Sequence, residues 1–240
     1  FIKTRRDFYY SKTEDAYYIT LDAFTNYYFC PYAYYLGFAK RLSLSNTKDK
    51  RLTKKIIHLD AAISKTLKQP VLHGLTMSMS SKTFTIDQLF DMWKINWEKE
   101  HFFILSLGEI PMKTIEGKAR TILQKIFSKM EPLEIPVLET SGEIRRTFGT
   151  FRGKKFGIKF NHQGILYRKT PDWQADNLYI PFVKDYFSSM DVFSVKYYVP
   201  LMIYAYMLRE YVYEKFKKKS KISCYFADLT SGQLFYTEKI

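Results

Sequence analysis

The chain has 240 residues, 46% of them hydrophobic, and carries 38 Lys and Arg against 24 Asp and Glu, a net charge of +14. This length suits one large domain or two small ones, and the excess of cations favours a polyanionic partner through counterion release. Apolar runs stop short of the ~18 residues of a membrane span. The two separated cysteines, Cys30 and Cys224, make neither a disulfide framework nor a four-cysteine metal site.

The N-terminal part of the chain is predicted to be mainly helical. Thr20 is a predicted N-cap, because Leu21 and Tyr28 then fall on one face of a helix. Thr85, with Gln88 three residues later, resembles a capping box for another helix. The other predicted elements are a strand or arm over 1–19, a short helix from Pro31, a basic amphipathic helix over 48–68, a loop over 70–84, and helices over 85–103 and 112–130.

The pattern changes near Pro132. Glycines divide residues 135–169 into short segments, which predicts two or three antiparallel strands. The remaining predicted elements are a strand over 178–186, a helix over 190–217 and a hairpin of strands over 222–229 and 234–240. Pro200 is expected to kink or interrupt the long helix. The predicted buried stripe of that helix consists of Val192, Val195, Val199, Met202 and Tyr206.

Helices that precede a sheet with a further helix packed on it predict an α/β fold. We expect a single domain over residues 1–240. Its helical N-terminal half, residues 1–132, would pack on a mixed central sheet formed within residues 133–240.

Asp185 is the acid that points to a chemistry. It ends an apolar strand, where a metal-dependent nuclease places a carboxylate to hold Mg²⁺ or Mn²⁺. Such a site gains from a lysine two residues further along the strand, because side chains two apart point the same way. Phe187 occupies that place here, and phenylalanine can neither bind a metal nor polarise water.

Three motifs in chain order resemble one family. Residues 21–36 read Leu-Asp-Ala-Phe-Thr-Asn-Tyr-Tyr-Phe-Cys-Pro-Tyr-Ala-Tyr-Tyr-Leu, Gly157 begins a Gly-Ile-Lys-Phe strand, and Asp185 precedes a helix that contains Tyr204. This order is similar to the RecB-like branch of the PD-(D/E)XK nuclease superfamily, which includes the CRISPR-associated RecB-type exonucleases. The resemblance implies a restriction-endonuclease-like core with a long helix after the Asp185 strand.

The resemblance also implies roles for individual residues. The remnant catalytic positions are Asp185, His58 and Tyr204. The substituted positions are Lys159, Phe187 and Pro200, where the family has its first metal acid, its strand lysine and its helix glutamine. These departures imply a decayed catalytic centre in which Lys159 pairs with Asp185 in place of a metal. Iron–sulfur variants of the family need three further cysteines, so we expect no cluster and no metal cofactor.

Other interpretations of these residues stay open. His58 also suits a hydrogen-bonded core histidine. Asp185 could instead cap the following helix or pair with Lys184. The residues through which activity could survive are a migrated lysine, Lys196, and a relocated acid, Glu139 or Glu143.

Two basic clusters are the predicted contacts to phosphates, although either could be an ordinary solvated surface. One lies in the glycine-rich strands, and the other lies at the end of the long helix, where cations also suit the helix dipole. The predicted nucleic-acid-binding residues are Arg145, Arg146, Arg152, Lys154 and Lys155 in the first cluster and Lys215, Lys217, Lys218 and Lys219 in the second.

The sequence therefore predicts a catalytically inactive nuclease-fold protein that binds nucleic acid, DNA in preference to RNA. It would act as a subunit or scaffold of a nucleic-acid-processing or defence complex. One alternative is a divergent but active Mg²⁺- or Mn²⁺-dependent nuclease, and another is a scaffold for protein interactions. We expect an intracellular location, in the cytoplasm or at a nuclear or viral replication site, without a membrane partner.

Overall fold

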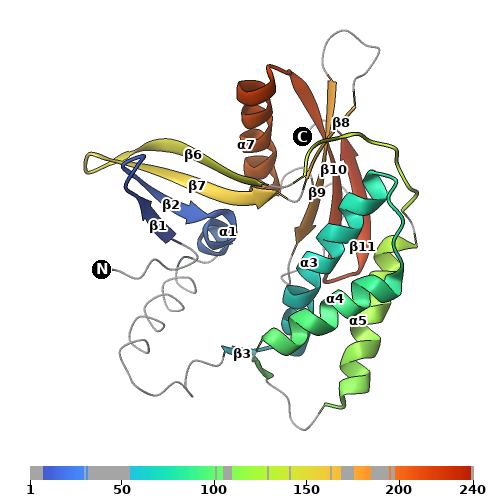
Figure 1. Ribbon diagram of the computed structural model, residues 1–240. Helices are drawn as coiled ribbons and strands as arrows, with labels where there is room; N and C mark the ends of the chain where they lie inside the picture. Colours follow the sequence, from blue (N-terminus) through green and yellow to red (C-terminus); the bar gives the residue numbers. More distant parts are fainter. Residues whose placement is uncertain are drawn as a thin grey trace. The chain divides into compact units, whose positions relative to one another are not determined.

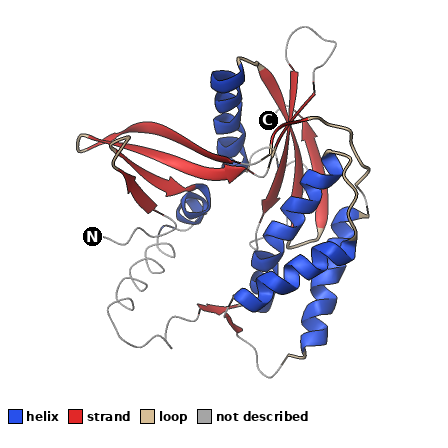
Figure 2. Ribbon diagram, in the orientation of Figure 1, coloured by secondary structure: helices blue, strands red, loops and turns tan. Residues whose placement is uncertain are grey.

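The computed structural model is a mixed α/β structure that divides into two compact units, which are described separately (Figure 1, Figure 2). Unit 1 consists of residues 1–53 and 141–162, and unit 2 of residues 54–140 and 163–240. The described residues are 8–29, 31, 55–100, 102–104, 110–128, 130–140, 142–162, 164–168, 176–184, 195 and 198–238. Where the sequence predicts one central sheet, the described residues form a mixed sheet in each unit.

Unit 1 is built on a four-stranded sheet. Its strands are β1 (Phe8–Ser11), β2 (Ala16–Thr20), β6 (Gly142–Phe151) and β7 (Lys154–His162), in the order β1-β2-β7-β6. β1 and β2 form one antiparallel hairpin, and β6 and β7 form another. The two hairpins are joined by parallel pairing of β2 with β7, so segments far apart in the sequence share one sheet.

Helix α1 (Leu21–Phe29) follows β2 directly and packs on β2 and β7. The predicted N-cap is confirmed, because Oγ1 of Thr20 accepts the backbone N–H of Ala23 at 3.2 Å. Leu21 is buried, but Tyr28 is 50% exposed and lies outside the buried face. Cys30 and the predicted helix after Pro31 fall outside the described residues.

Unit 2 is built on a five-stranded sheet with the order β11-β10-β9-β8-β5. Its strands are β5 (Val137–Glu139), β8 (Ile165–Arg168), β9 (Asp176–Lys184), β10 (Ser220–Asp228) and β11 (Gln233–Glu238), and β3 (Lys55–Ile57) and β4 (Phe102–Ile104) form a separate parallel pair. β9 and β10 are parallel and the other neighbours are antiparallel. The predicted C-terminal hairpin is confirmed as β10 and β11.

Helices cover both faces of this sheet. Phe182 of β9 contacts α7 (Val199–Phe216), with the Tyr204 ring 5.6 Å from that of Phe182, and Phe226 of β10 contacts Tyr198, the N-cap of α7. Val183 and Ala227, the next residues along the same strands, point the opposite way and join the core formed with α3, α4 and α5. α3 and α7 therefore lie on opposite faces of the sheet.

Helix α3 (Leu59–Met79) runs through residues predicted to form a loop. The interior Pro70 removes a backbone donor from the carbonyl of Thr66, which is why a proline there argues against a helix. The neighbouring helix compensates: Nδ2 of Asn96 donates to the Thr66 carbonyl at 3.4 Å, and Nε1 of Trp93 donates to Thr66 Oγ1 at 2.9 Å. A tertiary contact thus permits a helix that the local sequence disfavours.

The start of the predicted 48–68 helix is also corrected, because β3 (Lys55–Ile57) precedes α3. The helices α4 (Ile86–Lys99) and α5 (Met112–Phe127) start where predicted, and the capping box of Thr85 and Gln88 has both of its hydrogen bonds. The predicted end of the first of these helices at residue 103 is corrected, because strand β4 occupies Phe102–Ile104. Within the described residues, no helix is both long enough and apolar enough to cross a membrane.

Helix α7 corrects two expectations. Pro200 lies in its first turn, where a missing N–H costs no helical hydrogen bond, so the proline starts this helix and does not kink it. Val195 of the predicted stripe is buried, but Met202 and Tyr206 are 45% and 42% exposed, so the part of the stripe that lies on α7 is not its buried face. The buried residues of α7 are Pro200, Leu201, Tyr204, Ala205, Met207, Leu208 and Val212.

Candidate nucleic-acid interface

The β6–β7 hairpin of unit 1 presents basic and aromatic side chains on a long ribbon. Arg152 and Gly153 connect the strands with φ values of 49° and 75°, the two positive angles of a type I′ turn. The sequence between Glu143 and Asp172 contains no Asp or Glu. The exposed aromatic residues of the hairpin are Phe148 (53%), Phe151 (68%) and Phe156 (41%). Cations interleaved with exposed rings are the composition that binds nucleic acid through phosphates and bases.

A β-bulge in β6 gives the ribbon its local shape. Thr147 pairs with Gly157 and Gly149 pairs with Phe156, so Phe148 is an extra residue in the ladder. Gly157 accommodates this arrangement, because a Cβ at that position would lie 2.2 Å from the carbonyl oxygen of Arg146. The glycine is therefore required by close backbone approach.

We expect Gly157→Ala to destabilise unit 1 by about 1–3 kcal/mol, the usual cost of forcing extra atoms into a packed site. The added Cβ would clash with a backbone atom of Arg146, so a change of side-chain rotamer cannot relieve the clash. Chemical unfolding followed by circular dichroism would measure the loss. Gly149→Ala is the matched control, because an added Cβ there meets nothing within 4 Å. Equal losses in both variants would contradict this role of Gly157.

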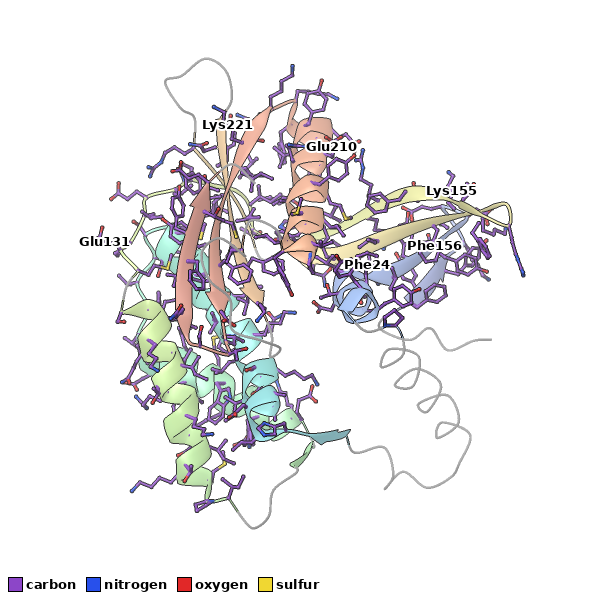
Figure 3. The ribbon with its side chains drawn as sticks, turned by 180° about the vertical axis from the view of Figure 1, so that it is seen from behind. Phe24, Glu131, Lys155, Phe156, Glu210 and Lys221 are labelled. Atoms are coloured by element: carbon purple, nitrogen blue, oxygen red, sulfur yellow. The ribbon has the colours of Figure 1, made fainter. Side chains whose placement is uncertain are left out.

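Side-chain alternation places the predicted binding residues of β7 on two faces of the sheet. Lys155 and Phe156, both labelled in Figure 3, are neighbours and point to opposite faces. The ion-paired face, as we name it, carries Tyr9, Tyr18, Arg145, Lys155 and Lys159. The aromatic face carries Phe8, Tyr10, Tyr17, Arg146, Phe151, Lys154 and Phe156.

Carboxylates neutralise cations on the ion-paired face. Nε of Arg145 donates to Glu143 at 2.5 Å, and the guanidinium lies 3.6 Å from Glu14. Hydrogen bonding to Glu143 raises the pKa of Arg145. Nζ of Lys159 lies 3.6 Å from Glu143 and 3.9 Å from the centroid of the Tyr9 ring. Arg145 and Lys159 thus have partners within their own sheet.

Cations at the turn end of the hairpin are more accessible. Nζ of Lys154 lies 2.7 Å from Asp15, and this hydrogen bond holds the pKa of the Asp15 carboxyl below its usual range. The guanidinium of Arg152 lies 5.4 Å from the centroid of the exposed Phe151 ring. Lys155 is exposed on the neighbouring strand. Arg152 and Lys155 are therefore the cations best placed to reach phosphates.

The second predicted basic cluster, at the end of α7, is partly engaged. Nζ of Lys215 lies 2.8 Å from Glu139 and donates to Oη of Tyr211 at 2.6 Å. Nζ of Lys218 lies 4.1 Å from the centroid of the Tyr167 ring. Lys215 is exposed although it is ion-paired, and Lys217, the C-cap of α7, and Lys219 are exposed as well.

The structure does not bring His58 and Tyr204 together. His58 is the N-cap of α3, its side chain is 59% exposed, and Nδ1 lies 3.8 Å from Asp60. It is therefore not a core histidine. Tyr204 is buried against the opposite face of the sheet, where burial raises its pKa. The two side chains consequently do not line a common site.

The acid that motivated a nuclease prediction, Asp185, lies outside the described residues, as do Phe187 and Lys196. Lys184, which was considered a partner for Asp185, lies 3.4 Å from Asp228. The suggested relocated acids also have basic partners: Glu139 contacts Lys215, and Glu143 contacts Arg145 and Lys159. In the described part of the chain, no three His, Cys, Asp or Glu side chains gather as a metal site requires.

The topology separates two strands that the resemblance places in one catalytic sheet. β7, which carries Lys159, pairs with β2 and β6, whereas β9, which leads to Asp185, pairs with β8 and β10. In the described residues these two strands belong to different sheets, and the restriction-endonuclease-like core stays a prediction.

Sequence reasoning identified the hairpin cations and missed the exposed rings between them. The available signal was the segment Phe148-Gly149-Thr150-Phe151-Arg152-Gly153, in which aromatic residues adjoin glycines of a turn. In comparisons with known proteins, no family model and no curated protein matches the chain. A functional proposal therefore starts from the geometry of the hairpin.

Proposed function

We propose that this protein binds nucleic acid through the β6–β7 hairpin of unit 1 and does not cleave it. The observation that carries the proposal is the combination of exposed rings with Arg152 and Lys155 on a ribbon whose sequence lacks acids beyond Glu143. Cations there would neutralise phosphates and release counterions. A net charge of +14 would speed the encounter by long-range attraction.

The absence of cleavage follows from the residues at the proposed catalytic positions. Lys159 is cationic where the resembled family has a metal-binding acid, and Glu143 and Tyr9 hold its ammonium. Pro200 supplies no amide side chain. We propose that the chain is a degenerate relative of the PD-(D/E)XK nucleases, prefers DNA, and serves in a larger nucleic-acid-processing complex.

The binding proposal is tested by removing the two most accessible cations. We expect Arg152→Ala/Lys155→Ala to weaken binding to a fluorescently labelled oligonucleotide, with the loss largest at low salt. The slope of log affinity against log salt concentration should fall by about 1 for each phosphate contact removed. Fluorescence anisotropy over a salt series measures both quantities.

The matched control is Lys82→Ala/Lys113→Ala, which removes the same charge from exposed positions of unit 2. It should change the affinity and the slope less than the hairpin variant does. Equal effects would assign binding to overall charge and reject the hairpin site. A wild-type chain without measurable affinity for DNA or RNA would reject the function and favour the protein scaffold.

Catalysis is tested separately with end-labelled single- and double-stranded DNA and RNA in Mg²⁺ or Mn²⁺. We expect intact substrates after prolonged incubation. Metal-dependent cleavage that Asp185→Ala abolishes would instead establish the alternative, an active nuclease with relocated groups.

A further inference from the structure

Four aromatic rings form a continuous row on the aromatic face of unit 1. The ring centroids of Tyr10 and Tyr17 are 4.8 Å apart, and those of Tyr17 and Phe8 are 5.5 Å apart with an angle of 16° between the planes. Phe8 continues the row to Phe156 at 6.3 Å. Strands β1, β2 and β7 thus each contribute to one row of rings.

The row ends at an exposed ring. Phe8, Tyr10 and Tyr17 are of intermediate burial, whereas Phe156 is 41% exposed. Further along the same face of β7, Ile158 and Phe160 are buried, at 6% and 8% exposure. The face is therefore covered at one end of the strand and open at the end nearest the turn.

Cations accompany this open end. Nζ of Lys154 lies 5.7 Å from the centroid of the Tyr10 ring and donates a hydrogen bond to the carboxylate of Asp15. The same carboxylate accepts a hydrogen bond from Oη of Tyr10. Arg152 stands in the adjoining turn beside Phe151, a second ring that is 68% exposed. Rings next to positive charge complement a ligand that has both flat apolar groups and phosphates.

We propose that the aromatic face stacks the unpaired bases of a single-stranded nucleic acid, with Phe156 and Phe151 as the contacting rings. This inference rests on the proposed function and adds to it a preference for unpaired bases. A duplex presents phosphates and base edges but hides its base faces within its own stack, and exposing them costs energy. A single strand offers those faces freely, so stacking distinguishes it from a duplex of equal charge.

The test compares three labelled ligands that carry the same number of phosphates, at one salt concentration: a single-stranded homopolymer of pyrimidines, a duplex of half its length, and an abasic strand. The abasic strand keeps the phosphates and lacks the bases. Deoxyribose and ribose versions of the homopolymer are both measured, since either sugar carries the proposed stacking group. We expect the homopolymer to bind at least about fivefold tighter than the abasic strand, the lower end of the effect of one stacked base.

Phe151→Leu/Phe156→Leu should remove this advantage and leave the affinity for the abasic strand unchanged. Leucine keeps apolar bulk and removes the ring, so the variant is expected to fold, and Phe151→Leu alone gives a milder second test. Tyr236→Leu is the control, because Tyr236 is also a strand residue that is 41% exposed, but it lies in unit 2. It should leave all affinities unchanged.

The outcomes separate the two proposals. Equal affinity for all three ligands would overturn the stacking inference and leave nucleic-acid binding intact. Affinity for none of them would overturn both. A homopolymer advantage that survives the double leucine variant would place base recognition elsewhere on the chain.

Discussion

Lys184→Met is expected to lower the free energy of unfolding by about 3–5 kcal/mol, the usual cost of breaking a buried ion pair from one side. The ammonium of Lys184 lies 3.4 Å from the carboxylate of Asp228, and the two side chains are only 3% and 0% exposed. Methionine fills a similar volume but leaves a buried carboxylate without this cation. Chemical unfolding followed by circular dichroism measures the change.

The loss of stability should be large because Lys184 and Asp228 lie at the ends of two strands and Asp228 also holds the turn that follows. The residues are opposite each other at the carboxyl ends of the parallel strands β9 and β10. Asp228 also organises the following turn, because it accepts hydrogen bonds from the Thr230 backbone N–H at 3.1 Å and the Ser231 hydroxyl at 2.9 Å. The carboxylate therefore stabilises both the strand end and the β10–β11 turn.

A double variant separates the ion pair from the turn. Lys184→Met/Asp228→Asn removes both charges and keeps a side-chain oxygen for the turn, so it should recover most of the stability that either single variant loses. Losses that simply add in the double variant would contradict an energetic coupling between Lys184 and Asp228.

Trp93→Ala should likewise cost about 3–5 kcal/mol, because it removes a large side chain from a packed core. Trp93 is fully buried, and its ring centroid lies 5.2 Å from that of Phe90 and 5.6 Å from that of Trp97. Its Nε1 also donates to Oγ1 of Thr66, in the turn of α3 that precedes Pro70. Loss of the indole therefore leaves a cavity and loosens the contact that accommodates the proline.

The control for this variant is Ile95→Ala in the same helix. Ile95 is 50% exposed, so its truncation should change the stability by no more than about 0.5 kcal/mol. Equal effects of the two substitutions would contradict the placement of Trp93 in the core of unit 2.

Elements whose signals are local were predictable from the sequence. The N-cap at Thr20 and the capping box at Thr85 and Gln88 depend on hydrogen bonds within one turn, and both are present. The C-terminal hairpin was predictable because a short polar turn separates two apolar segments. The basic residues of the β6–β7 hairpin were also identified, because the charge of a side chain is read directly from the sequence.

Other features depend on neighbours that the local sequence does not reveal. The Ser- and Met-rich composition of residues 70–84 predicts a loop, but the first part of this segment is helical. Asn96, from another helix, supplies a donor to the Thr66 carbonyl that Pro70 leaves without one. The exposed side of α7 was misassigned because tyrosine and methionine suit a core as well as a surface. Which face is buried depends on where Phe182 and Phe226 lie in the sheet beneath the helix.

For the candidate site, the sequence by itself determined which side chains are present: a basic hairpin, many aromatic rings, and Lys159 at a position where the nuclease family that the sequence resembles has an acid. Only the tertiary structure decided how these groups are used. Pairing of β2 with β7 assembles the row of rings, and Glu143 neutralises Arg145 and Lys159 on the opposite face. The physical reason is that sheet register and ion pairing join residues distant in the chain, whereas composition and spacing report only what each segment can do alone.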